Sequence, residues 1–258
     1  ALIRMVNMSP EFLLTAALAF FRLPNPSLGF LVPLSQHRPS HGFRRDALPK
    51  ERLIELTKEY LAAPSPDWWS DDFVLRGPVI GPLCKTDIIA TLSSVRGADG
   101  DRAATMADAF PDLQENAFGF TADDPIEPGR VWYFVRPRGT FTGPFDHPVV
   151  GRIEPTGAAY VAPPEVRSVI FDAAGKVRYQ SVGYVTDRFT GDTTGGRGAV
   201  FGQYAVMGQE IDATIGSPVT VALQKLTMML PDGKIPKSYS RKEDIPGWWT
   251  DPRMGAEK

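Results

Sequence analysis

Two long segments with strand-like composition, residues 131–145 and 165–188, dominate the middle of the chain. Both are rich in aromatic and β-branched residues, which favour strands. A Pro-Thr-Gly corner at residues 155–157 lies between them, and Pro137 and Gly139 interrupt the first segment. Because such residues mark bends or bulges in strands, the sequence predicts a strongly curved sheet, a common way to build a small cone around a ligand pocket.

Helical patterns lie on both sides of these strands. The clearest, residues 49–62, places apolar side chains three and four positions apart on one face and has prolines at its start and beyond its end. The other expected elements are strands at residues 72–76 and 114–121, helices at residues 85–94, 103–110 and 218–230, and a hairpin that turns at residues 172–175.

The first part of the chain, residues 1–47, has the character of a targeting segment. The apolar run at residues 12–21 has the length of a signal-peptide core and is too short to span a bilayer. A basic, hydroxylated stretch without acids follows as far as Asp46. Together they resemble the bipartite plastid presequence of an alga, with a disordered arm of a cytoplasmic protein as the alternative. The predicted remainder is a cone domain at residues 48–202 and a C-terminal helix with a surface-wrapping tail at residues 203–258.

Composition excludes several classes of function. The net charge of −2 gives no electrostatic reason to expect nucleic acid, and no membrane span is predicted in the mature protein. One cysteine, Cys84, rules out a disulfide within the chain, and of three histidines only His147 lies beyond residue 47. The glycines of residues 196–202 do not have dinucleotide-loop spacing. We therefore predict no metal site and no cofactor.

Short phrases in the middle of the chain resemble the SnoaL-like branch of the nuclear transport factor 2-like superfamily. Residues 110–113 read Phe-Pro-Asp-Leu, residues 154–157 read Glu-Pro-Thr-Gly, and residues 172–176 form a D-x-x-G-K turn. The resemblance covers about residues 51–201. It implies an α+β fold, a cone-shaped, curved mixed or antiparallel sheet with N-terminal helices, here followed by the C-terminal helix and tail.

Members of this superfamily include cyclases, isomerases, dehydratases, carriers and oligomerising domains, so the fold alone does not select a function. The enzymes need a base that removes a proton next to a carbonyl and a donor for the resulting enolate. Where the isomerases carry their base this chain has Arg76, and the last strand carries Tyr179, Gln180 and Ser181 where an acid is frequent. The familiar chemistry is therefore in doubt.

Candidate site residues follow from strand positions and from the resemblance. Asp187 or His147 is the candidate acid–base group and Tyr179 the candidate donor. Asp187 could instead cap a turn or pair with Arg188 or Arg136, and His147 could be a solvated loop residue. Arg136 shares one strand face with two aromatic residues, and if that face points inward it lies near the pocket mouth. The candidate ligand-binding residues are Trp132, Phe134, Arg136, Tyr184 and Arg76.

The first functional hypothesis is a cone protein that binds a small hydrophobic molecule, with isomerase, lyase or cyclase chemistry left undecided. The second is a non-catalytic homodimeric scaffold that pairs through its sheet and places Trp248 and Trp249 on a partner. A pigment or lipid carrier is the third. A pocket with an inward acid or histidine near a tyrosine would favour the enzyme, and a cone plugged by aromatic side chains would favour the scaffold.

Overall fold

The computed structural model describes residues 48–93, 103–147, 150–190, 193–209, 214–215, 217–227 and 237–249. The predicted presequence, residues 1–47, lies outside the described residues, as does the end of the predicted C-terminal helix at residues 228–230. Among the described residues, none of the helices has the length and hydrophobicity needed to cross a bilayer.

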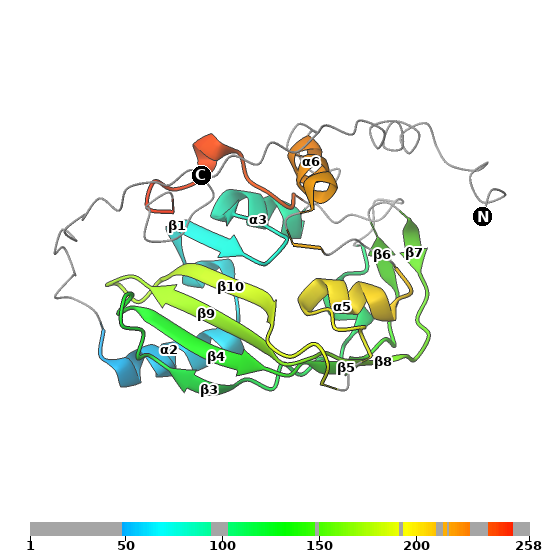
Figure 1. Ribbon diagram of the computed structural model, residues 1–258, viewed down its shortest axis with the longest axis horizontal. Coiled ribbons are helices and arrows are strands. Elements are labelled where there is room, and N and C mark those ends of the chain that lie inside the picture. The colour runs from blue at the N-terminus through cyan, green and yellow to red at the C-terminus, as the bar shows by residue number, and fades with distance from the viewer. Residues whose placement is uncertain are drawn as a thin grey trace, which may run out of the picture. The chain divides into compact units, whose positions relative to one another are not determined.

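A six-stranded sheet forms the centre of the described chain, with the strand order β2-β1-β10-β9-β4-β3 (Figure 1). Neighbouring strands are antiparallel, except that β1 and β10 run parallel. The α+β class with a mixed, mostly antiparallel sheet is thus confirmed. The strands are β1 (Trp69–Arg76), β2 (Leu83–Cys84), β3 (Phe118–Thr121), β4 (Arg130–Val135), β9 (Glu165–Phe171) and β10 (Val177–Val185).

The predicted hairpin joins β9 and β10, and local chemistry fixes its turn. Asp172 Oδ1 accepts hydrogen bonds from the backbone N–H groups of Ala174 and Lys176, both at 2.9 Å. Gly175 has φ +77°, a conformation that glycine adopts without strain. Because all these contacts lie within five residues, the turn could be predicted from the sequence alone.

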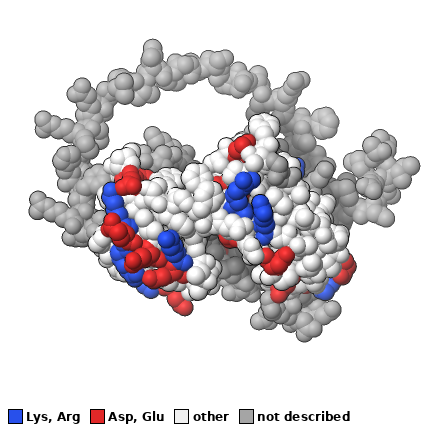
Figure 2. Space-filling view, turned by 90° about the horizontal axis from the view of Figure 1, so that it is seen from below, with Lys and Arg blue, Asp and Glu red and all other residues white. Residues whose placement is uncertain are grey.

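Helix α2 (Lys50–Ala62) covers one face of the sheet, which we call the α2 face, and α3 (Lys85–Ser93) packs against β1 and β2. The apolar stripe of α2 is buried, as its spacing predicts. Its exposed side carries basic and acidic side chains that mingle over the surface (Figure 2). The α2 face is closely packed, and its fully buried side chains include Leu53, Tyr60, Phe73, Val131, Tyr133 and Val135.

This packing decides which way the side chains of β4 point. Val131, Tyr133 and Val135 face α2, so Trp132 and Phe134 lie on the opposite face of the sheet. The arrangement in which Trp132, Phe134 and Arg136 point into the cone is therefore wrong. The cone is filled by the tyrosines and phenylalanine of the α2 face rather than by the aromatic residues named from the sequence.

The rest of the chain forms two small sheets and a second core beyond the end of β4 (Figure 1). The segment predicted as one bent strand is three strands, with the first break at Pro137. Two further strands in this part of the chain and helix α5, which begins inside the glycine-rich stretch 196–202, were not predicted. These elements are β5 (Arg138–Thr140), β6 (Phe145–His147), β7 (Gly151–Ile153), β8 (Ala159–Val161), α4 (Met106–Ala109) and α5 (Ala199–Val206). Elsewhere, a 3₁₀ helix, η3 (Pro66–Trp68), precedes β1.

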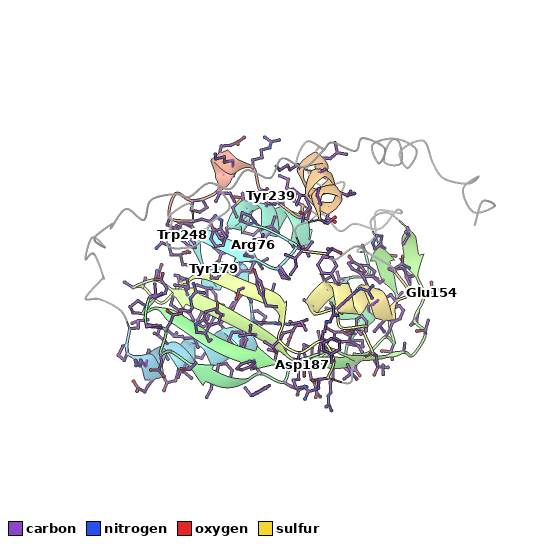
Figure 3. All side chains as sticks on the ribbon, in the orientation of Figure 1. Arg76, Glu154, Tyr179, Asp187, Tyr239 and Trp248 are labelled. Carbon is purple, nitrogen blue, oxygen red and sulfur yellow. The ribbon has the colours of Figure 1, made fainter. Side chains whose placement is uncertain are left out.

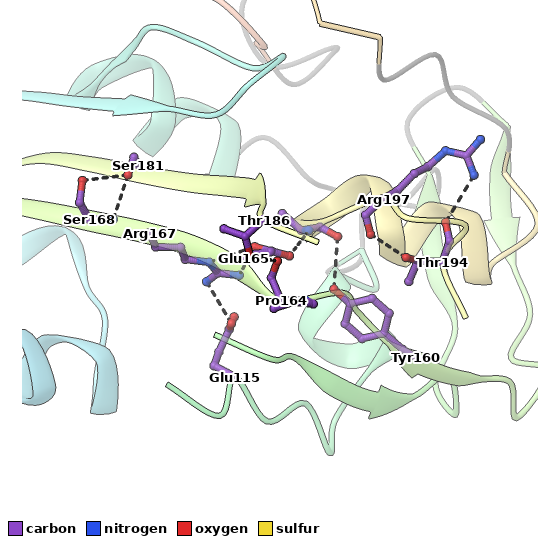
Figure 4. A network of polar contacts seen from close by, with 11 residues as sticks. Glu115, Tyr160, Pro164, Glu165, Arg167, Ser168, Ser181, Thr186, Thr194 and Arg197 are labelled. Atoms are coloured by element: carbon purple, nitrogen blue, oxygen red, sulfur yellow. Dashed lines mark hydrogen bonds and ion pairs between the residues drawn. The ribbon is translucent and has the colours of Figure 1, made fainter. Parts of the chain in front are cut away.

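A buried carboxylate connects α5 to the sheet (Figure 4). Glu165 is 0% exposed; its Oε2 accepts hydrogen bonds from Arg167 at 3.1 and 3.2 Å. Its Oε1 accepts the first backbone N–H of α5, from Ala199, at 2.7 Å. Arg167 also pairs with Glu115 at 3.0 Å. Burying charge is costly unless it is paired in this way, so the network fixes α5 on β9.

The C-terminal part crosses the other face of the sheet. Helix α6 (Pro218–Thr227) is followed in the described chain by residues 237–249, which we call the strap and which include the 3₁₀ helix η4 (Lys242–Asp244). The strap is held at one end by Lys237, paired with Asp87 at 2.8 Å, and at the other by the indole N–H of Trp248, which donates to the carbonyl of Asp72 at 2.9 Å. We call the face beneath it the strap face.

Trp249 stacks on Tyr179 of β10 with ring centroids 5.4 Å apart, and it is only 6% exposed. The hypothesis that Trp248 and Trp249 bind a partner protein is therefore wrong in this structure. Both tryptophans pack on the chain's own sheet.

Candidate functional site

A half-open pocket of about 450 Å³ lies between the strap and the strap face. Strands β4, β9 and β10 supply its floor, the loop before β4 supplies one side, and the strap supplies Trp249. The wall is mostly apolar and aromatic, with a few polar groups. Its residues are Asp124, Ile126, Glu127, Arg130, Trp132, Val166, Tyr179, Ser181, Tyr184 and Trp249.

Arg130 is the central polar residue of the pocket. Arg130 is only 9% exposed. Its guanidinium carbon lies 5.0 Å from the ring centroid of Trp132 and 5.2 Å from that of Tyr179. Such contacts stabilise a cation on an aromatic surface. Nη1 of Arg130 donates to Ser168 Oγ at 2.8 Å. Burial lowers the pKa of Arg130 from its ordinary value, but the group remains a cation at neutral pH.

Asp124 holds the loop that carries it. Its Oδ1 accepts the backbone N–H groups of Ile126 and Glu127, both at 2.9 Å, and its Oδ2 accepts the indole N–H of Trp132 at 2.8 Å. Arg130 Nε lies 3.5 Å from Oδ2. Burial alone would raise the pKa of Asp124, but these hydrogen bonds and the nearby arginine outweigh it, so the pKa is lowered.

Tyr179 lies beneath the strap, close to Trp248 and Arg76 (Figure 3). Burial, followed by the proximity of Tyr184, raises its pKa to about 12, although Arg130 and Arg76 act in the opposite direction. The phenol therefore stays protonated at neutral pH and can donate a hydrogen bond. The pocket thus has an apolar wall, a cation and a phenolic donor.

Three of the residues named from the sequence line this pocket: Trp132, Tyr179 and Tyr184. Arg76 lies next to it, close enough to lower the pKa of Tyr179, while its own guanidinium donates to the carbonyls of Gly77 and Ile80. Phe134 is on the same face of the sheet but farther along β4, where it stacks on Phe118. The structure brings these residues to one face, with Phe134 outside the pocket lining.

Asp187 lies beyond the end of β10 (Figure 3) and outside the pocket lining. Its carboxylate accepts hydrogen bonds from the N–H of Phe189 at 3.0 Å and from the hydroxyl of Thr190. These bonds, with the hydroxyl of Thr190 first, lower its pKa, and Arg136 contributes. This is the geometry of an aspartate that caps a turn near an arginine, which the sequence analysis gave as the alternative to an acid–base role.

His147 belongs to the second core rather than to the pocket. It is on β6, its ring lies 5.4 Å from that of Tyr204, and its Nδ1 accepts the N–H of Val150 at 3.1 Å. Burial lowers its pKa, so the imidazole is neutral at pH 7. The structure therefore does not bring the three candidate catalytic residues, Asp187, His147 and Tyr179, together.

Sequence reasoning missed Arg130, Asp124 and Trp249 as pocket residues. Arg130 begins β4 two residues before Trp132, so the alternation of a strand already placed the two side chains on one face. Asp124 lies in the acidic, proline-containing segment 123–129, which has no strand or helix pattern to place its side chain. Trp249 was assigned to a partner surface instead, because its place depends on contacts with a strand seventy residues earlier.

Two solved structures are similar to part of this fold. One, described as a SnoaL-like polyketide cyclase from Jannaschia sp. CCS1, is 17% identical with a TM-score of 0.35 and covers 54% of this chain and 89% of its own. The other, a phenazine biosynthesis-related protein from Pseudomonas aeruginosa, is 10% identical with a TM-score of 0.35 and covers 69% and 96%. No family model matches the chain, and no curated protein matches it. Likeness at this level says nothing about activity.

Proposed function

We propose that this chain binds a small, mostly apolar, ring-bearing molecule in the pocket between the sheet and the strap. The observation that carries the proposal is the convergence of four aromatic residues from three segments: Trp132 on β4, Tyr179 and Tyr184 on β10, and Trp249 on the strap. The volume of about 450 Å³ lies in the range of roughly 300–1,000 Å³ that is typical of small-molecule sites. Rings on the wall favour a ligand that stacks on them.

The polar groups of the pocket support binding better than acid–base catalysis. A base that removes a proton from carbon works best with a pKa near the operating pH. The pKa of Asp124 is lowered instead, and that of Tyr179 is raised to about 12, which makes the phenol a donor and not a base. Isomerase, lyase or cyclase chemistry is therefore not part of the proposal.

The proposal is tested with a panel of aromatic alcohols of one to three rings, measured by isothermal titration calorimetry. At least one is expected to bind, and Trp132→Leu is expected to weaken that binding about fivefold, because loss of a ring contact is worth about 1 kcal/mol. Phe189→Leu, at an 83% exposed phenylalanine outside the pocket lining, is the matched control and should leave the affinity unchanged. Equal binding by wild type and Trp132→Leu would contradict the proposed site.

Native mass spectrometry of the protein from its source gives a second readout. We expect a reproducible small molecule of fixed mass on the wild-type chain. Its absence, together with no binding from the panel, would refute the binding function.

A second candidate function is a non-catalytic scaffold that dimerises through its sheet. The observation that favours it is an exposed aromatic pair: Phe118 on the edge strand β3 and Phe134 on β4 are 48% and 37% exposed and stack 5.7 Å apart. Large exposed apolar side chains beside a sheet edge are typical of contact surfaces. Light scattering coupled to size exclusion should then report a dimer that Phe134→Ser converts to a monomer, with Phe189→Ser as the control.

A further inference from the structure

The hydrogen-bonding capacity of Arg130 is not used up within the chain. A guanidinium has five N–H donors. Among the described residues, Ser168 Oγ accepts one from Nη1 at 2.8 Å, and the ion pair of Nε with Asp124 is long, at 3.5 Å. The ring faces of Trp132 and Tyr179 contact the guanidinium, and Tyr179 is also a hydrogen-bond partner of it. A cation that is 9% exposed and lines a pocket therefore keeps donors for an occupant.

The negative charge nearest to Arg130 is already shared. The two oxygens of Asp124 accept three N–H groups at 2.8–2.9 Å, from Ile126, Glu127 and Trp132, before the arginine is considered. Those donors spread and stabilise the carboxylate charge, so Arg130 is only partly compensated. Glu127 also lines the pocket, and its side chain is half-buried. Water therefore screens the repulsion between Glu127 and an anion more than it screens a contact between the anion and the pocket floor.

One other hydrogen-bond donor in the pocket wall has no acceptor within the described chain. The indole Nε1 of Trp249 is buried and has no hydrogen-bond partner among the described residues, and this residue is only 6% exposed. The phenol of Tyr179 is protonated at neutral pH because its pKa is raised to about 12, and within the chain it has Ser181 as a hydrogen-bond partner. A buried donor without an acceptor is costly, so the wall favours an occupant that brings acceptor oxygens.

We infer that the ligand is a ring-bearing carboxylate, or an equivalent anion with its charge on oxygen, whose oxygens contact Arg130 while its ring lies against Trp132 and Tyr184. This inference rests on the proposed binding function and adds the ligand's charge to it. A planar guanidinium suits a carboxylate because two parallel N–H groups can meet its two oxygens.

Three probes with one ring system test the charge: 2-naphthoate, 2-naphthalenemethanol and 2-naphthylmethylammonium, titrated into the full chain at pH 7 by calorimetry. We expect the carboxylate to bind about tenfold or more tightly than the alcohol, and the ammonium most weakly. Arg130→Gln should bring the carboxylate to the affinity of the alcohol and leave the alcohol within about twofold. Arg152→Gln, which removes the same charge from an exposed arginine on β7, should preserve the ranking.

The wild-type ranking decides the inference even if Arg130→Gln does not fold. An alcohol that binds as tightly as the carboxylate, or an ammonium that binds best, would overturn the anionic class and leave the binding function standing. If none of the three probes binds and the aromatic alcohols also fail, both the inference and the binding function are refuted.

Discussion

Replacing Glu165 by glutamine should lower the free energy of unfolding strongly, because it removes a buried charge while keeping nearly the same side-chain shape. Glu165→Gln keeps an oxygen that can accept the N–H of Ala199, so the start of α5 remains bonded. It removes the charge that balances Arg167, which keeps only the half-exposed Glu115 at 3.0 Å. Removing one partner of a buried ion pair costs about 3–5 kcal/mol. Since Glu115 remains, we expect a loss of about 3 kcal/mol in the free energy of unfolding.

The assay is urea unfolding at pH 7, followed by circular dichroism. Glu154→Gln is the matched control, because Glu154 is an exposed partner of Arg152 and such pairs are worth at most about 1 kcal/mol. The double variant Glu165→Gln/Arg167→Met removes the unbalanced cation as well. It should therefore lose less stability than the two single variants added together, by about 1 kcal/mol or more.

Two results would refute this reasoning. A Glu165→Gln protein within about 0.5 kcal/mol of wild type would mean that the buried pair contributes nothing beyond an exposed one. Strict additivity in the double variant would mean that Glu165 and Arg167 do not act as a pair.

Three further predictions concern the strap, the loop before β4 and the first part of the chain. Trp249→Ala should cost about 3 kcal/mol in urea unfolding, whereas Trp249→Phe should stay within about 1 kcal/mol, because it also removes the unpartnered indole N–H; equal losses would contradict this. Asp124 has a lowered pKa, so its stabilising effect is complete above the ordinary value of 3.8 and is lost as the pH falls through the lowered value. Unfolding midpoints compared at pH 7 and pH 3 should therefore fall more for wild type than for Asp124→Asn. We propose that residues 1–47 direct a fluorescent reporter to an algal plastid when residues 1–50 are fused to it, and a cytosolic signal would oppose this.

The parts of the fold that could be predicted are those whose causes are local. The β9–β10 turn depends on Asp172 and Gly175, and helix α2 depends on its own apolar spacing and on Pro49. Helix α5 was missed because its first N–H is capped by Glu165, a residue distant in sequence, while the preceding glycines argue for a loop. Helix propensity is a local property, so it does not reveal a cap that a distant residue supplies.

The sequence of β4 could not show which of its two faces packs against α2, because both faces are apolar. Val131, Tyr133 and Val135 alternate with the aromatic pair Trp132 and Phe134, so the period of two is present but does not say which set faces the helix. Only the covering elements, α2 on one face and the strap on the other, settle the question. Three pocket residues could still be named from the sequence because ring-bearing strand positions are informative on either face.

Neutral polar side chains form a hydrogen-bonded chain in the middle of the α2 face. Trp69 Nε1 donates to the hydroxyl of Tyr60 at 3.1 Å, and that hydroxyl donates to Gln180 Oε1 at 2.7 Å. Gln180 points toward α2, while its neighbours Tyr179 and Ser181 line the pocket on the other face. A neutral amide satisfies the tyrosine without leaving a charge in the core. The same face also carries the buried ion pair of Glu165 and Arg167, which lie opposite Val135 and Tyr133 in the sheet, whereas Arg130 lies on the strap face.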